Sequence, residues 1–153
     1  MRVISLILLV VFLVGCKNVS STAQSTGTVT APLPEALRLF RDVCLNTAPS
    51  FKKARAVAEK QGITNFQDTG WKAMALTEDK RLSIQIYKNI ECAVTTPSSL
   101  DERTSHAFMQ TLNDYLGYKV LPQHPMIIEL EDDIFRVFHD RSGGEAFVIV
   151  ILR

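Results

Sequence analysis

The chain has 153 residues, which is room for one domain of ordinary size. Its 17 lysines and arginines nearly balance its 16 aspartates and glutamates, so the formal net charge is +1. This balance gives no electrostatic support for nucleic-acid binding, and no nucleic-acid partner is expected.

The first segment has the anatomy of a signal peptide. Residues 3–14, VISLILLVVFLV, are apolar apart from Ser5, and Arg2 supplies a short positive start. Signal peptides combine such a start with an apolar core of about 7–15 residues and a small residue at the cleavage site. The competing interpretation is a transmembrane helix, but it needs about 20 apolar residues, and this run ends at Gly15-Cys16-Lys17. Residues 1–15 are therefore predicted to be a signal peptide.

The end of this segment, Leu13-Val14-Gly15-Cys16, resembles the lipobox of bacterial lipoproteins. The resemblance is confined to residues 1–16. It implies that Cys16 is acylated on its sulfur, that the signal is cleaved before Cys16, and that the acyl chains attach the protein to the membrane. In that family an aspartate after the cysteine favours the inner membrane, whereas Lys17 here implies the outer membrane, with the domain in the periplasm. The alternative is a cysteine that lies by chance near an ordinary cleavage site.

The next segment is predicted to be a flexible tether. Residues 17–31, KNVSSTAQSTGTVTA, are small and polar and have no apolar periodicity. A flexible chain of this length has a root-mean-square reach of about 20 Å. Residues 16–31 are thus predicted to be a lipidated cysteine and its tether, and residues 32–153 a single globular domain.

Two helices are expected at the start of the domain. Pro34 suits the first turn of a helix, and the apolar residues that follow share one arc until about Asn46. Pro49 is expected to open a second helix that ends before Gly62. The arc of the first helix contains Ala36, Leu37, Leu39, Phe40, Val43 and Cys44.

Strands dominate the remainder of the predicted domain. Residues 71–76, 82–86 and 90–94 read as a three-stranded meander, because apolar and polar residues alternate in the last two runs. Ser99 and Glu102 form a capping box that opens a helix ending before Gly117. Three further strands are expected at 126–130, 134–139 and 146–152, and the last of them is apolar on both faces, as a central strand is.

Together these elements predict an α+β fold. We expect two layers, with about three helices on one face of a mostly antiparallel sheet of five to six strands, in the order αα-βββ-α-βββ. About 120 residues suffice for one hydrophobic core, so neither a metal ion nor a disulfide is obligatory for folding.

A disulfide between Cys44 and Cys92 is nevertheless predicted. An exported chain meets an oxidising compartment, and assigning Cys16 to lipid leaves one pair. Both residues lie on apolar faces, so a helix packed on the sheet can bring them together. The closed loop of 49 residues (positions 44 to 92 inclusive) would add about 4 kcal/mol of stability by chain entropy. The alternatives are two buried free thiols or a catalytic thiol, but the sequence has no CxxC motif.

The histidines, the acidic residues and the serines of the domain are interpreted as structural residues and not as catalytic or metal-binding ones. The spacing of His106, His124 and His139 is unlike that of a zinc site, so no metal or cofactor is expected. "HDRS" at 139–142 holds His, Asp and Ser together, but adjacency in sequence is not evidence for a catalytic triad, which is defined by spatial geometry. The remaining candidates are read as hairpin turns or a helix cap: Glu129, Glu131, Asp132 and Asp133; Ser142, Gly143 and Gly144; and Ser98 and Ser99.

The second helix offers one candidate binding surface. Its polar side carries Lys52, Lys53, Arg55 and Lys60, which could contact anionic lipid headgroups beside the anchor. The alternative interpretation is an ordinary solvated helix face.

The sequence thus favours a membrane-anchored envelope lipoprotein that is a non-catalytic binding module for an envelope protein or another envelope component. No residue is predicted to be catalytic. One alternative is an envelope-acting enzyme whose site is assembled from residues distant in sequence. Another is an accessory component of a secretion or surface-assembly machine.

Overall fold

A computed structural model describes residues 32–97 and 103–152 of the chain. These residues belong to one compact unit, Pro32–Arg153. The predicted signal peptide, the lipidation of Cys16 and the tether lie outside the described residues, and so does the predicted capping box. No helix within the described ranges is long and apolar enough to cross a membrane.

The first predicted helix is present, but its type changes along its length. Helix α1 spans Glu35–Leu39, a π-helical turn η1 spans Phe40–Cys44, and a 3₁₀ turn η2 spans Leu45–Thr47. The Thr47 hydroxyl donates a hydrogen bond of 2.6 Å to the Val43 carbonyl. The predicted apolar arc is buried: Ala36, Leu37, Leu39, Phe40, Val43 and Cys44.

The second helix, α2, spans Ala54–Lys60 and is shorter than predicted. A start at Pro49 is wrong because Phe51 has a φ of 53°, in the left-handed region that an α-helix cannot use. This backbone turn accompanies burial of the Phe51 ring, which packs edge-to-face on Phe135 with ring centroids 6.2 Å apart. The helix begins only after this residue.

The sheet has seven strands in the order β1-β2-β3-β4-β7-β6-β5, with every neighbouring pair antiparallel. The α+β prediction is confirmed, but five to six strands was too few, because β1 has only two residues, both exposed, and carries no periodic signal. The element bounds are β1 Gln67–Asp68, β2 Lys72–Leu76, β3 Ser83–Tyr87, β4 Glu91–Thr96, α3 Arg103–Leu116, β5 Met126–Leu130, β6 Asp133–Asp140 and β7 Glu145–Ile151.

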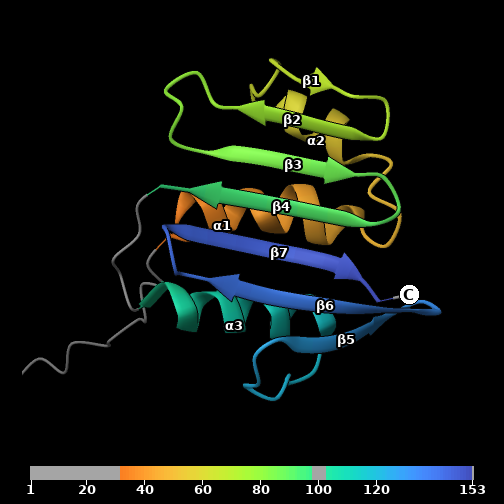
Figure 1. Ribbon diagram of the computed structural model, residues 1–153. Coiled ribbons are helices and arrows are strands. Elements are labelled where there is room, and N and C mark those ends of the chain that lie inside the picture. Colours follow the sequence, from red (N-terminus) through yellow and green to blue (C-terminus); the bar gives the residue numbers. More distant parts are fainter. Residues whose placement is uncertain (1–31, 98–102, 153) are drawn as a thin grey trace, which may run out of the picture. The chain divides into compact units, whose positions relative to one another are not determined.

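The helices α1, α2 and α3 all lie on one face of this sheet (Figure 1), which gives the two layers that were predicted. Strand β7 occupies an interior position between β4 and β6, as its apolar sequence indicated. Its Phe147 and Ile149 are fully buried on the helix side. Val148 and Val150 alternate with them and therefore point to the opposite, helix-free face.

Candidate functional site

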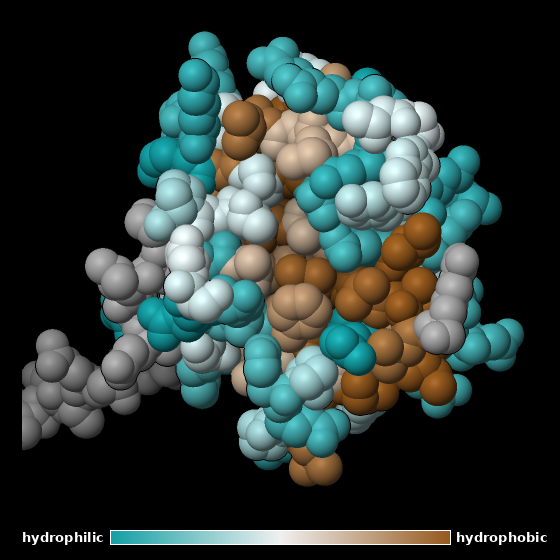
Figure 2. Space-filling model, in the orientation of Figure 1, coloured by the Kyte–Doolittle hydropathy of each residue, from teal (hydrophilic) through white to brown (hydrophobic). Residues whose placement is uncertain are grey.

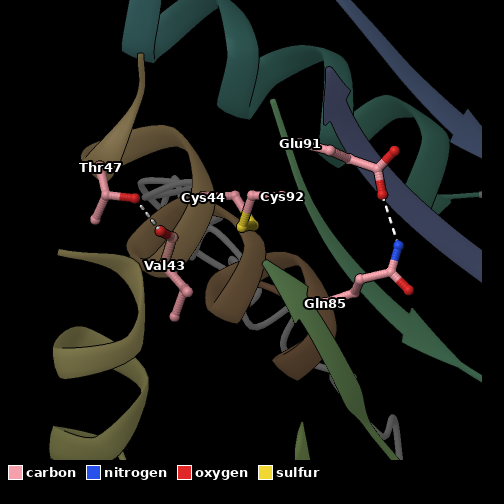
Figure 3. The surroundings of a disulfide bond; sticks show 6 residues. All are labelled: Val43, Cys44, Thr47, Gln85, Glu91 and Cys92. Atoms are coloured by element: carbon pink, nitrogen blue, oxygen red, sulfur yellow. Dashed lines mark hydrogen bonds between the residues drawn. A yellow bond between two sulfur atoms is a disulfide. The ribbon is translucent and has the colours of Figure 1, made fainter. Parts of the chain in front are cut away.

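The predicted disulfide between Cys44 and Cys92 is confirmed. It joins η1 to strand β4 (Figure 3), with the two Cα atoms 5.4 Å apart. Both cysteines are fully buried, so the bond lies in the core between the helical layer and the sheet. This bond rules out both alternatives, a pair of free thiols and a catalytic thiol.

A buried polar cluster surrounds His139 at the end of β6. Its Nε2 lies 3.5 Å from Oε1 of Glu145, and its Nδ1 lies 3.4 Å from the Ser105 hydroxyl on α3. Arg141 Nε is also 3.5 Å from the same Glu145 oxygen. The His139 ring stacks on Phe147 with centroids 4.7 Å apart. Burial lowers the pKa of His139, because the imidazolium loses its hydration, although the Glu145 carboxylate acts in the opposite direction.

This cluster contains the residue types of a hydrolytic triad, but it is closed. The side chains of His139 and Glu145 are only 6% and 3% exposed, so a substrate has no access to them. His139 and Asp140 end strand β6, so only Arg141 and Ser142 of "HDRS" lie in the turn, and the contacts of His139 with Ser105 and Glu145 were not predicted. Sequence alternation puts Glu145 on the same face as Phe147, diagonal to His139, and this signal could have revealed the pair.

The other two histidines and the acidic turn occupy different parts of the domain. His106 is exposed on α3, and His124 packs edge-to-face on Phe138 with centroids 6.3 Å apart. Glu131 has a φ of 58° in the turn between β5 and β6. Across residues 32–97 and 103–152 there is no group of three or more histidine, cysteine or acidic residues that could hold a metal ion.

The glycine turn between β6 and β7 is a hairpin, as predicted. Gly144 has a φ of 131°, and a Cβ at this position would lie 2.5 Å from the Thr96 carbonyl oxygen. Glycine is therefore needed here for close packing of the turn against the end of β4. The Asp140 carboxylate accepts a hydrogen bond of 2.9 Å from the Ser142 N–H and shapes the same turn.

The structure separates the four basic residues that were predicted to meet lipid. Lys52 and Lys53 precede α2 rather than lie on it, and both are exposed. Arg55 is ion-paired with Glu59 at 2.9 Å and with Asp68 at 3.2 Å. Lys60 ends α2 and is not among the residues that line the groove described next, whereas Lys52 and Arg55 are.

This groove lies where β2 and β3 meet the loop before α2, and we name it the Trp71 groove. It has a volume of about 360 Å³. Trp71 is 72% exposed and packs edge-to-face on Tyr87 with centroids 6.0 Å apart, while Lys72 Nζ lies 5.0 Å from the Tyr87 ring centroid. The lining residues are Phe51, Lys52, Arg55, Asp68, Gly70, Trp71, Lys72, Ala73, Ile86 and Lys88.

A tight turn explains the exposure of Trp71. Gly70 has a φ of 88°, and its N–H donates a hydrogen bond of 2.8 Å to the Asp68 carboxylate. Thr69 donates from its N–H and its hydroxyl to the Lys72 carbonyl, at 2.9 and 3.1 Å. The chain thereby reverses just before β2 and holds the indole outside the core.

A second exposed feature lies on the helix-free face of the sheet. The register places Ile127, Arg136 and Val150 in one row across β5, β6 and β7. Figure 2, which views this face, shows apolar side chains gathered over it. We name this surface the open-face patch, and its residues are Ile127, Ile134, Phe138, Val150 and Leu152; Val148 shares this face but is only 8% exposed.

The chain matches no family model, no curated protein and no solved structure.

Proposed function

We propose that the protein is an envelope lipoprotein, anchored through acyl chains on Cys16, whose domain is a non-catalytic binding module. The observation that carries this proposal is the sequence Leu13-Val14-Gly15-Cys16 behind an apolar run of signal-peptide length. Lys17 favours the outer membrane, with the domain in the periplasm. A single acyl chain binds a membrane only marginally, so a durable anchor needs at least two chains on Cys16.

The disulfide supports an exported protein. Disulfides persist in oxidising compartments such as the periplasm and are rare in the cytosol. The Cys44–Cys92 bond uses both cysteines of the domain. The one cysteine that remains of the three in the chain is Cys16. The cysteine usage therefore agrees with one lipid site and one structural bond.

The exposed apolar residues of the domain favour a binding role over a catalytic one. The cluster around His139 is buried, whereas the open-face patch and Trp71 are exposed. Ile127 and Ile134 are 44% and 50% exposed on a face that none of the described helices covers. Exposed apolar patches on small domains commonly mark interaction surfaces, and a protein partner with a complementary apolar surface fits this one.

The anchor is tested by labelling with a palmitate analogue in a bacterial host that has an outer membrane. The wild-type chain should incorporate label and partition into the detergent phase, and Cys16→Ser should do neither. Lys17→Asp is the matched control, since it keeps Cys16. It should retain the label but move the protein from the outer to the inner membrane fraction. An unlabelled wild-type chain, or equal labelling of Cys16→Ser, would show that the lipoprotein assignment is wrong.

The binding role is tested with a photoreactive amino acid placed at single positions in living cells. Ile127 on the open-face patch is the probe position, and exposed His106 on α3 is the control on the helical side. A discrete crosslinked protein is expected from position 127 and not from position 106. Identical crosslinking patterns from both positions would count against the open-face patch as the binding surface.

A further inference from the structure

We propose that the Trp71 groove docks on a membrane surface that carries anionic phospholipid headgroups, so that the domain lies against the bilayer instead of extending away from it. This inference rests on the proposed lipid anchor, which brings the domain to a membrane. It differs from the helix-face prediction, because Lys60 does not line the groove, Arg55 is ion-paired there, and Lys72 of β2 and Lys88 after β3 contribute instead.

The groove has an excess of uncompensated positive charge. Its one acidic lining residue, Asp68, is paired with Arg55 at 3.2 Å, so these two charges offset each other. Lys52, Lys72 and Lys88 also line the groove, and Lys53 adjoins it in sequence. Within the described part of the chain none of these four lysines has an ion-pair partner. Four such ammonium groups attract anionic headgroups.

Trp71 supplies an apolar contact in the middle of this charge. An indole has an apolar body and one N–H donor, and for this reason tryptophan concentrates at membrane–water interfaces. Trp71 is 72% exposed, its ring contacts the Tyr87 ring edge-to-face, and its backbone follows the Gly70 turn, so the indole is presented at the surface. An exposed indole that lines one groove with three lysines matches a surface with anionic headgroups above an apolar interior.

The lysines favour a diffuse anionic surface over a single defined anion. An ammonium group on a flexible stem acts as a point charge, whereas discrete recognition of phosphate or carboxylate generally uses the planar fork of arginine. The one arginine of the groove, Arg55, is engaged by Glu59 and Asp68. The groove therefore has the chemistry of electrostatic adsorption and lacks a free bidentate donor.

The predicted tether is long enough for this contact. The domain starts near the turn between β2 and β3, because Glu35 of α1 lies 3.8 Å from Arg81. Trp71 is at the other end of β2, one five-residue strand away, which is about 17 Å. Residues 17–31 reach about 20 Å on average and more when extended. The groove can therefore meet the bilayer that holds Cys16.

The test uses residues 17–153 without lipid, so that adsorption is separated from anchoring. This piece contains every described helix and strand and the whole buried core, which lies within 32–152. Trp71 is the single tryptophan of the chain, so intrinsic fluorescence reports on the groove alone. Vesicles of phosphatidylcholine with 30% phosphatidylglycerol (about one anionic lipid in three, giving a negative surface potential) should shift the emission to the blue and protect Trp71 from iodide. Pure phosphatidylcholine vesicles should not.

Matched charge variants locate the contact. Lys52→Gln with Lys88→Gln removes two groove charges, and each substitution should weaken vesicle partitioning by about fivefold. Lys80→Gln with Lys119→Gln removes the same charge from two exposed positions outside the groove, the first of them in the turn at the other end of β2. This control should change partitioning by less than about twofold, because solvent-exposed charges are screened beyond about 10 Å at 0.1 M salt. Trp71→Ala, measured by co-sedimentation, should also weaken binding.

Three results would overturn the inference. The first is an unchanged emission with anionic vesicles, and the second is an equal loss of binding in the two double variants. The third is an equal response to soluble polyphosphate without vesicles, which would assign the groove to a soluble polyanion. None of these results touches the palmitate labelling, so failure here is distinguishable from failure of the proposed anchor.

Discussion

Removal of the Cys44–Cys92 bond should destabilise the domain by an amount that its loop length sets. The bond spans a sequence separation of 48, which closes a loop of 49 residues when both ends are counted. Loop-closure entropy for this length is about 4 kcal/mol at 25 °C. Both cysteines are fully buried in a packed core, so replacement by alanine also leaves a small void that costs about 1 kcal/mol or somewhat more. The variant with Cys44→Ala and Cys92→Ala should therefore lose about 5 kcal/mol.

The assay is urea unfolding of residues 17–153, followed by far-UV circular dichroism, for the oxidised domain, the reduced domain and the double alanine variant. Reduction is done in denaturant, because the bond is inaccessible in the folded protein. The reduced domain should lie within about 1 kcal/mol of the alanine variant, and dithiothreitol should not change that variant. A thiol titration of the denatured oxidised domain should find no free thiol before reduction and two after it. If the oxidised domain and the alanine variant differed by less than about 1 kcal/mol, the loop-entropy reasoning would be refuted.

Two further predictions concern the hairpin between β6 and β7. Gly144→Ala should lower the free energy of unfolding by about 2 kcal/mol or more, because its φ is 131° and the new Cβ would meet the Thr96 carbonyl oxygen at 2.5 Å. Gly143→Ala is the control, since a Cβ there meets open space. A similar melting temperature for the two variants would contradict the packing argument. The pKa of His139 in the folded protein lies below the ordinary value of 6.5. Below about pH 6.5 the unfolded chain therefore binds a proton that the folded chain does not. The free energy of unfolding should fall there by up to about 1.4 kcal/mol for each pH unit that the pH drops. Urea titrations between pH 5 and pH 8 (about the range in which histidine titrates) should show this slope reduced in His139→Gln. An undiminished slope in that variant would assign the effect to other groups.

Much of the fold was predictable because its strands follow a simple rule. Alternating residues such as Ile84, Ile86, Cys92 and Val94 all face the helices, as period-two runs require. The fully apolar run around Val148 correctly indicated an interior strand. Period two fixes which face a side chain occupies, and it is robust because slippage by one residue would expose the whole set.

The errors occurred where tertiary packing overrides local preference. Phe51 takes a left-handed backbone conformation to enter the core, and this shortens the second helix in a way that Pro49 did not signal. Trp71 was assigned to a strand, whereas it lies just outside β2 on a turn made by Gly70.

The surfaces were the least predictable part. The Trp71 groove draws its lysines from the loop before α2, from β2 and from the turn after β3, and no spacing in sequence relates these segments. The disulfide was predictable because it required only one pairing, whereas the groove requires knowledge of which segments meet.

The position of β7 between β4 and β6 has a consequence for the order of folding. β7 is the last described strand in sequence, yet the strands on its two sides precede it, and Ala93 of β4 pairs with Val148 across more than a third of the chain. Contacts so distant in sequence close late and slow the folding of a domain. Cys44 and Cys92 both precede α3 in sequence, so oxidation can join η1 to the first meander before β7 has paired with β4 and β6. Until β7 arrives, β4 and β6 each present an unpaired edge, and this interval is when the chain is most exposed to aggregation.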